Sequence, residues 1–313
     1  MHVFHSKPRS ASRASALIAV YWVIAILSLA VFTTTQFLML ELETHASTEW
    51  EFRAGQFADM GIALAAHPGV ERWDSLLRQQ VDDTGGFHAM IRSEGARINL
   101  NHFAVSENGR IVLNEIFIRW GLDEQGALEL VDAITDWIDA DDNALPHGAE
   151  GNLYRSRGLR EQPYNRPFRS LDEVRLVRGF DQVAALQPGW RDAFTLLSSG
   201  PLDLNDASPE LIQLVCQCGM NDVQRLVSVR LGSDRQPDTQ DDVRFQSVDE
   251  ATNLLGIGAA MKQMLANLVS VGDSATRLIS IGTAGGVSVE RSLVLSDRDA
   301  QPVLLEVQTR VLR

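Results

Sequence analysis

The chain has 313 residues, enough for two domains, and its 45% hydrophobic and 22% charged residues are typical of folded rather than disordered proteins. Its formal net charge is −13, because 41 Asp and Glu residues outnumber 28 Lys and Arg residues. Nucleic-acid binding depends on Lys and Arg placed near phosphates, so this composition argues against a protein that binds nucleic acid.

The N-terminus combines a short basic segment with a long apolar one. The first 14 residues carry Lys7, Arg9 and Arg13 and no acidic residue. The segment 16–40 then contains 25 residues without a charge, more than the about 20 that a helix needs to cross a bilayer. Since basic residues favour the cytoplasmic side of a membrane, the C-terminal part is expected outside the cytoplasm.

Three interpretations of this segment are open: a secretory signal peptide, an uncleaved single-pass anchor, and a pilin-type leader that is cut before the apolar run. No A-x-A cleavage site follows the apolar core. Residues 41–67 contain no Pro and place apolar residues at helical spacing. We therefore expect one helix of about 50 residues that ends at His67-Pro68-Gly69, which is the shape of a pilin stalk and favours the third interpretation.

Residues 13–23, RASALIAVYWV, place a basic residue and a small residue before an apolar run with an early Trp. In this pattern the chain resembles the minor pseudopilin K of type II secretion systems, also called general secretion pathway protein K. The resemblance implies cleavage by a prepilin peptidase after Ala14, with Ser15 as the methylated mature N-terminus. Ala14 departs from the Gly that these peptidases favour before the cut.

The resemblance also gives a meaning to Ala19, the fifth residue of the mature chain. Most pilins have Glu there, and its carboxylate is thought to pair with the N-terminal amine of a neighbouring subunit. K pseudopilins resemble this sequence in lacking that Glu. A subunit without it cannot make the contact with a subunit ahead of it, which implies a position at the tip of the fibre.

A weak internal repeat runs through the body of the chain. Arg97–Asn101 echoes Leu202–Asp206, and the segment 168–180 echoes 245–257. Ser170 is expected to cap a helix in the first unit, and Ser247 is expected to do so in the second.

The stretch LDLNDASPELIQLV at 202–215 looks like the start of a helix-hairpin-helix unit. Such units often bind DNA, so a membrane-anchored receptor for DNA or a secreted protein is the alternative function. The acidic residues around this stretch favour a protein-interaction domain instead.

The C-terminal segment changes to alternating polar and apolar residues, in three runs at 276–282, 287–295 and 303–312. This pattern predicts a three-stranded antiparallel meander that packs on the amphipathic half of the stalk helix. The strand at Ala96–Leu100 is expected to join the meander. The fold class is therefore α+β: a pilin-like fold, in which a long N-terminal helix packs on a small antiparallel sheet, with a large inserted helical domain that contains two helix-hairpin-helix or SAM-like repeats.

The predicted boundaries follow from these elements together with the resemblance. They are a prepilin-type leader (1–14), the transmembrane half of the stalk helix (15–40), its periplasmic half with the first strand of the pilin domain (41–101), the inserted helical domain (102–272, repeat units about 97–180 and 202–257) and the C-terminal strands of the pilin domain (273–313).

An acidic loop at 139–150 carries the clearest chemical signal. Asp139, Asp141, Asn143 and Glu150 fall at positions 1, 3, 5 and 12, the oxygen-ligand spacing of a calcium loop, and Asp142 is a further candidate ligand. Ala144 replaces the Gly of an EF-hand at position 6, Pro146 lies inside the loop, and no clear exiting helix follows Glu150.

A solvated acidic loop after a helix is the plainer alternative to a calcium site. K pseudopilins have a similar Asp-rich stretch and bind calcium in this domain, so the resemblance implies calcium here too. A second acidic loop, 232–242, occupies the matching place in the repeat. The weaker candidate ligands are Asp136 in the preceding helix and Asp234, Asp238 and Asp241 in the second loop.

The remaining motifs give no reason to expect an enzyme. The sequence has no G-x-S-x-G, H-E-x-x-H or G-x-x-x-x-G-K-[ST] motif. A calcium-dependent hydrolase is a third candidate that would require turnover. Cys216 and Cys218 are two residues apart, where a disulfide would be strained in a helix; we expect two small buried residues, with a redox or metal role as the alternative.

Together these observations predict a non-enzymatic minor pseudopilin at the tip of a type II secretion pseudopilus, which starts or caps the fibre for protein export across the outer membrane. The resemblance implies other minor pseudopilins of the I and J type, the major pseudopilin and the prepilin peptidase as partners. It places the chain in the bacterial inner membrane by one helix, with the N-terminus in the cytoplasm and the head in the periplasm.

Overall fold

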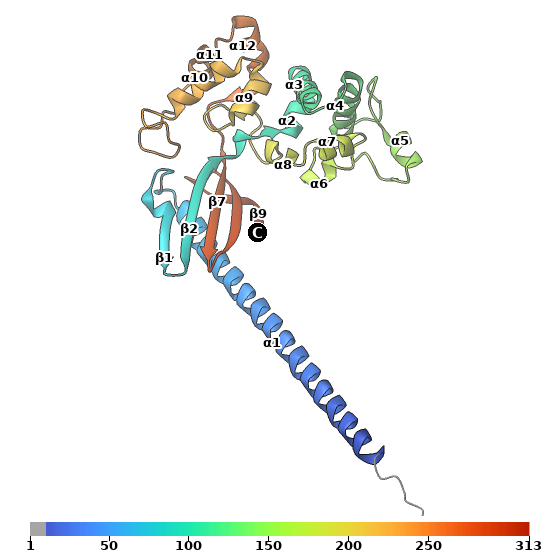
Figure 1. Cartoon of the computed structure of the whole chain (residues 1–313). Coiled ribbons are helices and arrows are strands. Elements are labelled where there is room, and N and C mark those ends of the chain that lie inside the picture. Colours follow the sequence, from blue (N-terminus) through green and yellow to red (C-terminus); the bar gives the residue numbers. More distant parts are fainter. Residues whose placement is uncertain (1–10, 313) are drawn as a thin grey trace, which may run out of the picture.

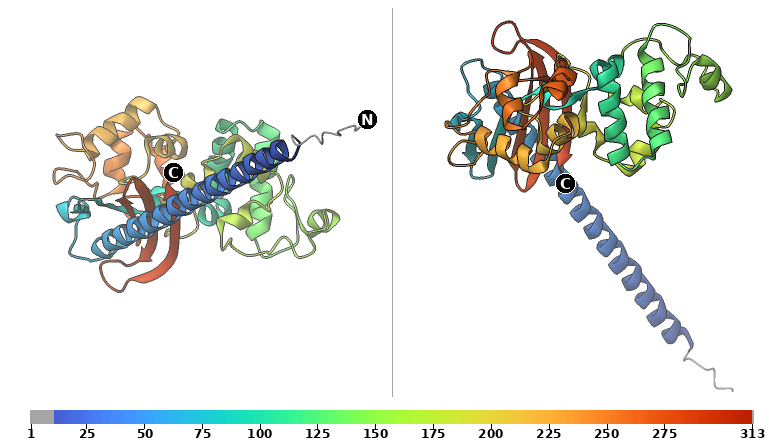
Figure 2. Two further views of the ribbon diagram at one scale, coloured as in Figure 1. Left: turned by 60° about the horizontal axis from the view of Figure 1, so that its bottom comes forward. Right: turned by 90° about the horizontal axis from the view of Figure 1, so that it is seen from above.

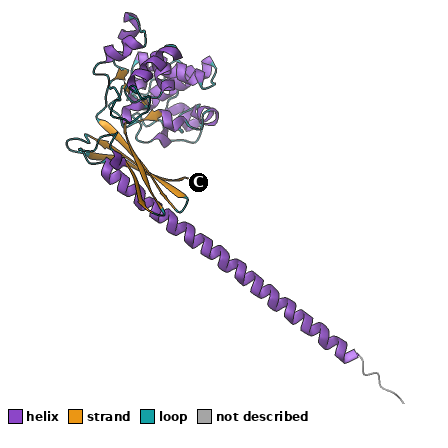
Figure 3. Cartoon of the chain, turned by 60° about the vertical axis from the view of Figure 1, so that its left-hand side comes forward, coloured by secondary structure: helices purple, strands orange, loops and turns teal. Residues whose placement is uncertain are grey.

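The computed structural model describes residues 11–312, and it describes the side chains of all of these except residues 11–17 and 38–47. The expected leader therefore lies outside the described residues over 1–10. The structure consists of a long N-terminal helix, a five-stranded antiparallel sheet against its C-terminal end, and a helical domain inserted between two strands of that sheet (Figure 1). The helical domain lies at the end of the sheet away from the free part of the helix (Figures 1 and 3).

Helix α1 runs without a break from Ala11 to Ala65. It ends two residues before the expected stop at His67, because Pro68 lacks an N–H group to continue the ladder. The Arg298 side chain, 8% exposed, donates to the backbone oxygens of Ala65, His67 and Val70 at 2.8, 2.7 and 2.6 Å. A cation at the C-terminal end of a helix satisfies free carbonyls and opposes the negative end of the dipole, so Arg298 fixes where the stalk stops.

The sheet has the strand order β1-β2-β7-β8-β9, and every neighbouring pair is antiparallel. Its strands are β1 (Arg78–Asp82), β2 (Gly85–Ser93), β7 (Ala275–Ala284), β8 (Val287–Ser296) and β9 (Val303–Leu312), and the short 3-10 helix η1 (Ser75–Leu77) precedes β1. The C-terminal meander predicted from the alternating pattern is thereby confirmed.

The prediction that Ala96–Leu100 joins this sheet is wrong. Only Ile98 and Asn99 are extended there, as β3, and they pair in parallel with β4 (Phe194–Thr195) inside the helical domain. The other two strands of the main sheet are β1 and β2, which the sequence analysis did not predict. The predicted insertion, 102–272, is accordingly too short at its start: the chain leaves the sheet after Ser93 and returns at Ala275.

Helix α1 lies on one face of the sheet over β2, β7 and β8. Phe57 and Ile62 of the helix share an apolar core with Leu278, Phe87 and other sheet residues. At the closest approach both sides are small. A Cβ added at Gly282 would overlap the backbone oxygen of Ala54 and the nitrogen of Ala58, and one added at Gly61 would overlap Ser280. Glycine on both sides allows the helix and sheet backbones to come together.

The inserted domain forms two lobes on either side of the sheet's upper end (Figure 2). The first lobe contains η2 (Glu94–Ala96), β3 (Ile98–Asn99), α2 (Leu100–Val105), α3 (Glu107–Arg119), α4 (Glu124–Ile138), α5 (Gly151–Ser156), α6 (Leu171–Val174), α7 (Phe180–Leu186), α8 (Trp190–Ala193) and β4. The second contains β5 (Leu202–Asp203), α9 (Pro209–Cys216), α10 (Met220–Arg230), α11 (Val248–Leu254), α12 (Ala259–Leu265) and β6 (Val269–Ser270). One apolar core serves both lobes and is separate from the core under the sheet.

The two lobes share a hydrogen-bonding feature. The Asn101 side chain donates to the backbone oxygen of Phe168 and accepts from its nitrogen, at 3.0 and 2.8 Å. Asn205 makes the same pair of bonds to Phe245, at 3.0 and 2.9 Å.

Each Phe stands two residues before a capping serine. Ser170 accepts from the nitrogen of Glu173, and Ser247 accepts from that of Glu250, as predicted. The shared bonds align Ile98–Asn101 with Leu202–Asn205, one residue away from the predicted register of the repeat.

We expect Gly282→Val to destabilise the head by about 3 kcal/mol, because the added side chain meets helix backbone that cannot move aside. Thermal unfolding of the full chain in detergent measures the change. Gly272→Ala is the matched control, since a Cβ there meets nothing within 4 Å. Equal stability of the two variants would show that α1 does not pack closely on β7.

Candidate functional site

The apolar part of α1 is free of contacts with the rest of the chain. Ile18–Phe37 has a mean hydropathy of 2.0, is long enough to cross a bilayer and is 0% buried. Such a segment fits a single-pass membrane anchor. The predicted processing site, Ala14 and Ser15, lies within α1, but its side chains are outside the described ones. Ala19 is exposed on the helix surface.

The first acidic loop joins α4 to α5. Asp139 caps the end of α4, its backbone nitrogen donating to the oxygen of Thr135 at 3.0 Å. Helix α5 begins at Gly151, with Glu150 as its N-cap, so the expectation that no helix follows Glu150 is wrong. The loop folds back over α4, because the Asp136 carboxylate accepts from the nitrogens of Leu145 and Ala149 at 3.1 and 2.7 Å. The loop therefore has the helix–loop–helix order of a calcium loop, with a short second helix.

Three carboxyl groups gather at the base of this loop. Burial, together with the charges of Asp136 and Asp139, raises the pKa of Glu150 from its ordinary 4.5 to about 7. Burial also raises the pKa values of Asp136 and Asp139, and each of these feels a neighbouring acid. These groups destabilise one another when ionised, as carboxylates do where no cation lies between them.

Several oxygens at this place are buried without a hydrogen-bond partner. They are both carboxylate oxygens of Glu150, Oδ1 of Asp139 and Oδ1 of Asn165. Asn165 reaches the loop from the segment before α6, and its Nδ2 donates to Asp142 Oδ1 at 3.1 Å and to the backbone oxygen of Asp141 at 2.9 Å. Buried acceptors without donors are costly, and a cation bound by oxygens is one kind of partner that such acceptors can take.

The predicted ligands do not surround a common point in this structure. Across the described residues, no three His, Cys, Asp or Glu side chains are close enough to hold a metal ion as they stand. Asp141, Asp142 and Asn143 are exposed at the rim of the loop, whereas Asp136 and Glu150 are buried at its base. The residues present nevertheless fit a hard cation, because the donors are all oxygens. Arg178 lies near Asp136, but among the described residues its ion pair is with Glu129 and not with Asp136, Asp139 or Glu150.

The second acidic loop uses its carboxylates differently. Asp241 accepts from the nitrogens of Ser233 and Asp234, at 2.7 and 3.2 Å, and the pKa of Asp241 is lowered mainly by its hydrogen bond from the Ser233 side chain. Asp238 forms an ion pair with Arg92 at 2.5 Å. Asp234 accepts from the nitrogen of Gln236 at 2.8 Å. These three weaker candidates thus have protein partners that satisfy them.

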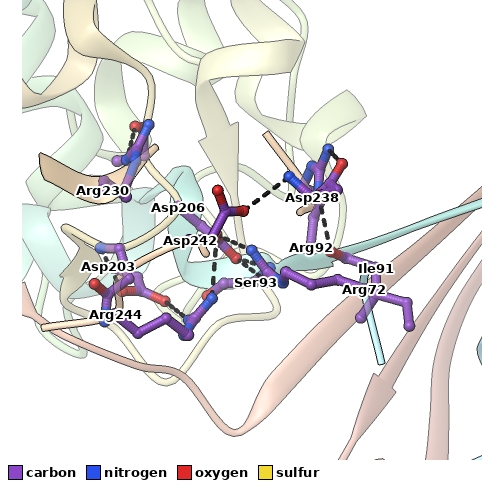
Figure 4. A network of polar contacts seen from close by, with 12 residues as sticks. Arg72, Ile91, Arg92, Ser93, Asp203, Asp206, Arg230, Asp238, Asp242 and Arg244 are labelled. Atoms are coloured by element: carbon purple, nitrogen blue, oxygen red, sulfur yellow. Dashed lines mark hydrogen bonds and ion pairs between the residues drawn. The ribbon is translucent and has the colours of Figure 1, made fainter. Parts of the chain in front are cut away.

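A polar network joins the second lobe to the pilin domain (Figure 4). Asp206, only 4% exposed in its side chain, forms two hydrogen bonds with Arg72, at 2.6 and 2.8 Å, and accepts from the backbone nitrogen of Ser93 at 2.7 Å. Arg244 lies 3.5 Å from Asp206 and 4.0 Å from the buried Asp203. Although burial opposes it, the Arg72 hydrogen bonds and charge hold the pKa of Asp206 well below its ordinary value.

A second buried network joins the first lobe to the sheet. Glu94 is 0% exposed and accepts from Arg277 of β7 at 2.7 Å, from Arg97 and from Thr195. Arg277 also reaches Glu306 of β9 at 3.1 Å. The sequence analysis missed these ionic contacts, because nothing in the local pattern marks which of many Arg and Asp residues meet across the domain boundary.

Cys216 and Cys218 are both free thiols, the first buried and the second half-buried. The expectation of two buried residues holds for Cys216, whereas Cys218 is less buried than expected. Burial raises the pKa of Cys216 far above its ordinary value, which disfavours a reactive thiolate.

A long apolar helix packed on an antiparallel sheet with a helical insertion is a pilin-like architecture, and three comparisons show similarity to one kind of pilin-like protein. Residues 96–188 match the family model described as "Type II secretion system (T2SS), protein K". The chain is 24% identical over 160 residues to the type II secretion system protein K of Pseudomonas aeruginosa, an alignment that covers 48% of this chain and 46% of that protein. The protein of the same name from Klebsiella pneumoniae is 26% identical over 122 residues, 36% of this chain and 37% of that one.

The fold agrees with a solved structure over nearly the whole chain. It matches a chain of the GspK-GspI-GspJ complex from enterotoxigenic Escherichia coli with a TM-score of 0.59 and 16% identity, covering 86% of this chain and 99% of the other. The sequence alignments, in contrast, span less than half the length of the curated relatives. The predicted resemblance to the protein K family and the predicted α+β fold, a long N-terminal helix on an antiparallel sheet, are confirmed, whereas the assignment of the two repeats to the helix-hairpin-helix or SAM-like type stays a prediction.

We expect the metal-free protein to lose stability as the pH rises from about 4.5 to about 7, because folded Glu150 keeps its proton in that window while the unfolded chain releases it. Glu150→Gln should remove this dependence and stabilise the protein by roughly 1–2 kcal/mol at pH 8. Chemical denaturation with chelator present measures both effects. Glu161→Gln, at an exposed position in the same lobe, is the control and should leave the dependence of stability on pH unchanged. If Glu150→Gln also leaves it unchanged, the pKa of Glu150 is not raised in the folded protein.

Proposed function

We propose that the chain is a minor pseudopilin of protein K type, which stands at the tip of a type II secretion pseudopilus and starts or caps the fibre. The helical insertion between β2 and β7 is the observation that carries the proposal. A pilin-like sheet would otherwise continue directly from Ser93 to Ala275, and the inserted residues 96–188 are those that match the protein K family model. The proposed role is structural, in line with a sequence that has no G-x-S-x-G, H-E-x-x-H or G-x-x-x-x-G-K-[ST] motif.

Ala19 supports the position at the tip. Counted from Ser15, it occupies the fifth mature position, where a carboxylate would pair with the N-terminal amine of another subunit. A methyl side chain makes no such ion pair, so the subunit has no electrostatic requirement for a neighbour ahead of it. The inserted domain adds bulk at the end of the sheet away from the membrane segment, where it would obstruct a further subunit (Figure 3).

The proposed partners are other minor pseudopilins, the major pseudopilin and the prepilin peptidase. The matched solved structure is a complex of GspK with GspI and GspJ, which supports minor pseudopilins of the I and J type as neighbours. The proposed location is the inner membrane, crossed once by α1, with the basic N-terminus in the cytoplasm and the head in the periplasm.

We further propose that the first acidic loop binds calcium. Asp139 and Glu150 at its base would supply buried carboxylate oxygens, Asn165 a neutral oxygen, and Asp141, Asp142 and Asn143 could close over the ion from the rim. The buried oxygens without donors support this assignment. When bound, the cation would neutralise carboxylates that otherwise repel one another and would tie the loop between α4 and α5 to the segment before α6.

Intact mass spectrometry of the protein isolated from its native membrane tests the proposed function. We expect a chain that begins at Ser15 and carries one methyl group, because a prepilin peptidase both cuts and methylates its substrates. Ala14→Trp should remain unprocessed, since a large residue replaces the small one before the cut. A wild-type chain that still begins at Met1 would overturn the assignment and favour the uncleaved receptor.

Calcium should raise the unfolding temperature of the full chain in detergent, with a gain of about 2.7 kcal/mol at a calcium concentration 100 times the dissociation constant. The double variant Asp139→Asn, Glu150→Gln should lose the response. Asp241→Asn, which alters the second loop, is the matched control and should keep it. Calorimetric titration measures the stoichiometry, and an unchanged calcium response in the double variant would place the ion elsewhere.

A further inference from the structure

Strand β9 forms an outer edge of the sheet, and within residues 11–312 no other strand pairs with its outer side (Figure 1). It is ten residues long and mostly exposed. Its large apolar side chains are exposed by 57%, 55%, 41% and 56% at Val303, Leu304, Leu305 and Val307. The opposite edge, β1, is half as long, with five residues, and reads Arg-Gln-Gln-Val-Asp.

Exposed edges are normally protected against pairing with other chains. Proteins shorten them, place Lys or Pro on them, or cover them with another element. Strand β9 has no Lys and no Pro, and it carries only one acidic and one basic residue, Glu306 and Arg310. It pairs irregularly with β8 at one place, around Leu305, and regularly from Glu306 to Leu312. It therefore presents a row of free backbone N–H and C=O groups that a strand from another chain can pair with.

The two faces of β9 differ. Val307 is opposite Leu293 and Val311 is opposite Val289, and both β8 residues pack toward α1. Helix α1 itself covers β2, β7 and β8. A groove remains between α1 and β9, lined by Phe52 of the helix and by Thr309 and Val311 of the strand. On this face a strand added beside β9 would bury apolar side chains against Val307 of the strand. Farther along, beside Thr309 and Val311, it would meet Phe52 in the groove, which Glu51 and Asp59 of the helix also line.

The other face of β9 carries Glu306 and Gln308, which border a hollow below the first lobe. The hollow is also lined by Arg97, Arg169 and Arg191. Arg169 is exposed and has no ion-pair partner among the residues that the structure describes. Arg97 and Arg191 are already paired with Glu94 and Asp172, so an acidic side chain on the same face of an added strand would meet the guanidinium group of Arg169.

We propose that the outer edge of β9 binds an extended segment of another protein, in which apolar residues alternate with acidic ones. The apolar residues would lie over the groove beside α1, the acidic residues would point toward Arg169, and the backbone would extend the sheet by a sixth strand. This surface does not depend on the proposed secretion role, because it follows from the free edge and its two unlike faces.

A fluorescent ten-residue peptide that alternates Val with Glu is the probe, added to the full chain in detergent. We expect saturable binding by fluorescence anisotropy and slower hydrogen exchange of the β9 amides. Val307→Lys and Arg169→Glu should each weaken binding at least tenfold. Val81→Lys on the opposite edge is the matched control and should bind like wild type, and a peptide with Pro at its two central Val positions should not bind.

Three results would overturn the proposal. One is peptide binding of equal strength to Val307→Lys and wild type. Another is binding that Phe52→Lys abolishes while the β9 amides exchange at their free rate, which would indicate a helix in the groove instead of a strand. The third is protection of the β9 amides that grows with protein concentration without peptide, which would show that a second copy of the chain covers the edge.

Discussion

The close approach of α1 to the sheet is the contact on which the rest of the structure depends. Stacked layers of structure are normally kept well apart, about 10 Å for two sheets, because side chains fill the space between their backbones. Here Gly61 on the helix and Gly282 on β7 leave the two backbones in direct contact. Because the same helix continues into the segment that fits a membrane anchor, this contact couples the head rigidly to the anchor.

The C-terminal hairpin completes that coupling. Arg298, between β8 and β9, closes the free carbonyl end of α1 through three hydrogen bonds. The last strands of the chain are therefore needed to finish its first helix. The large insertion does not disrupt the sheet, because it enters and leaves the sheet at neighbouring points: Ser93 at the end of β2 pairs with Thr276 at the start of β7.

The insertion is held by ionic contacts more than by a shared apolar core. The core of the lobes and the core under the sheet are separate clusters. Between them lie the buried Glu94–Arg277 pair and the Asp206–Arg72 pair. Burying charges costs desolvation energy that a good geometry only partly returns, so such pairs add less stability than apolar packing would. They do require one arrangement of the partners, and they thereby orient each lobe on the sheet.

The sequence predicted the elements whose signal is local. The unbroken apolar run predicted the long helix α1, and the alternating runs predicted the strands β7 to β9. Ser170 and Ser247 were correctly predicted as helix N-caps. Strands β1 and β2 were missed, because RQQVD has no apolar alternation and Gly85-Gly86 signals a turn. The predicted register of the repeat was wrong by one residue. Asn101 corresponds to Asn205 because the two side chains bind equivalent residues, Phe168 and Phe245, which lie 67 and 40 residues farther along the chain, and local sequence does not show such contacts.

The two acidic loops show why composition alone could not identify a metal site. Both have four or more oxygen donors within about a dozen residues, and both appeared as candidates. In the second loop the chain itself supplies the donors, from Arg92 to Asp238 and from Ser233 to Asp241. In the first loop the described residues place no Lys or Arg against Glu150, whose nearest charges are those of Asp136 and Asp139. The proposal of a cation at the first loop thus depends on its several buried oxygens that lack a protein donor, compared with one such oxygen, Asp242 Oδ1, in the second loop. That property belongs to the folded structure and not to the spacing of the acids.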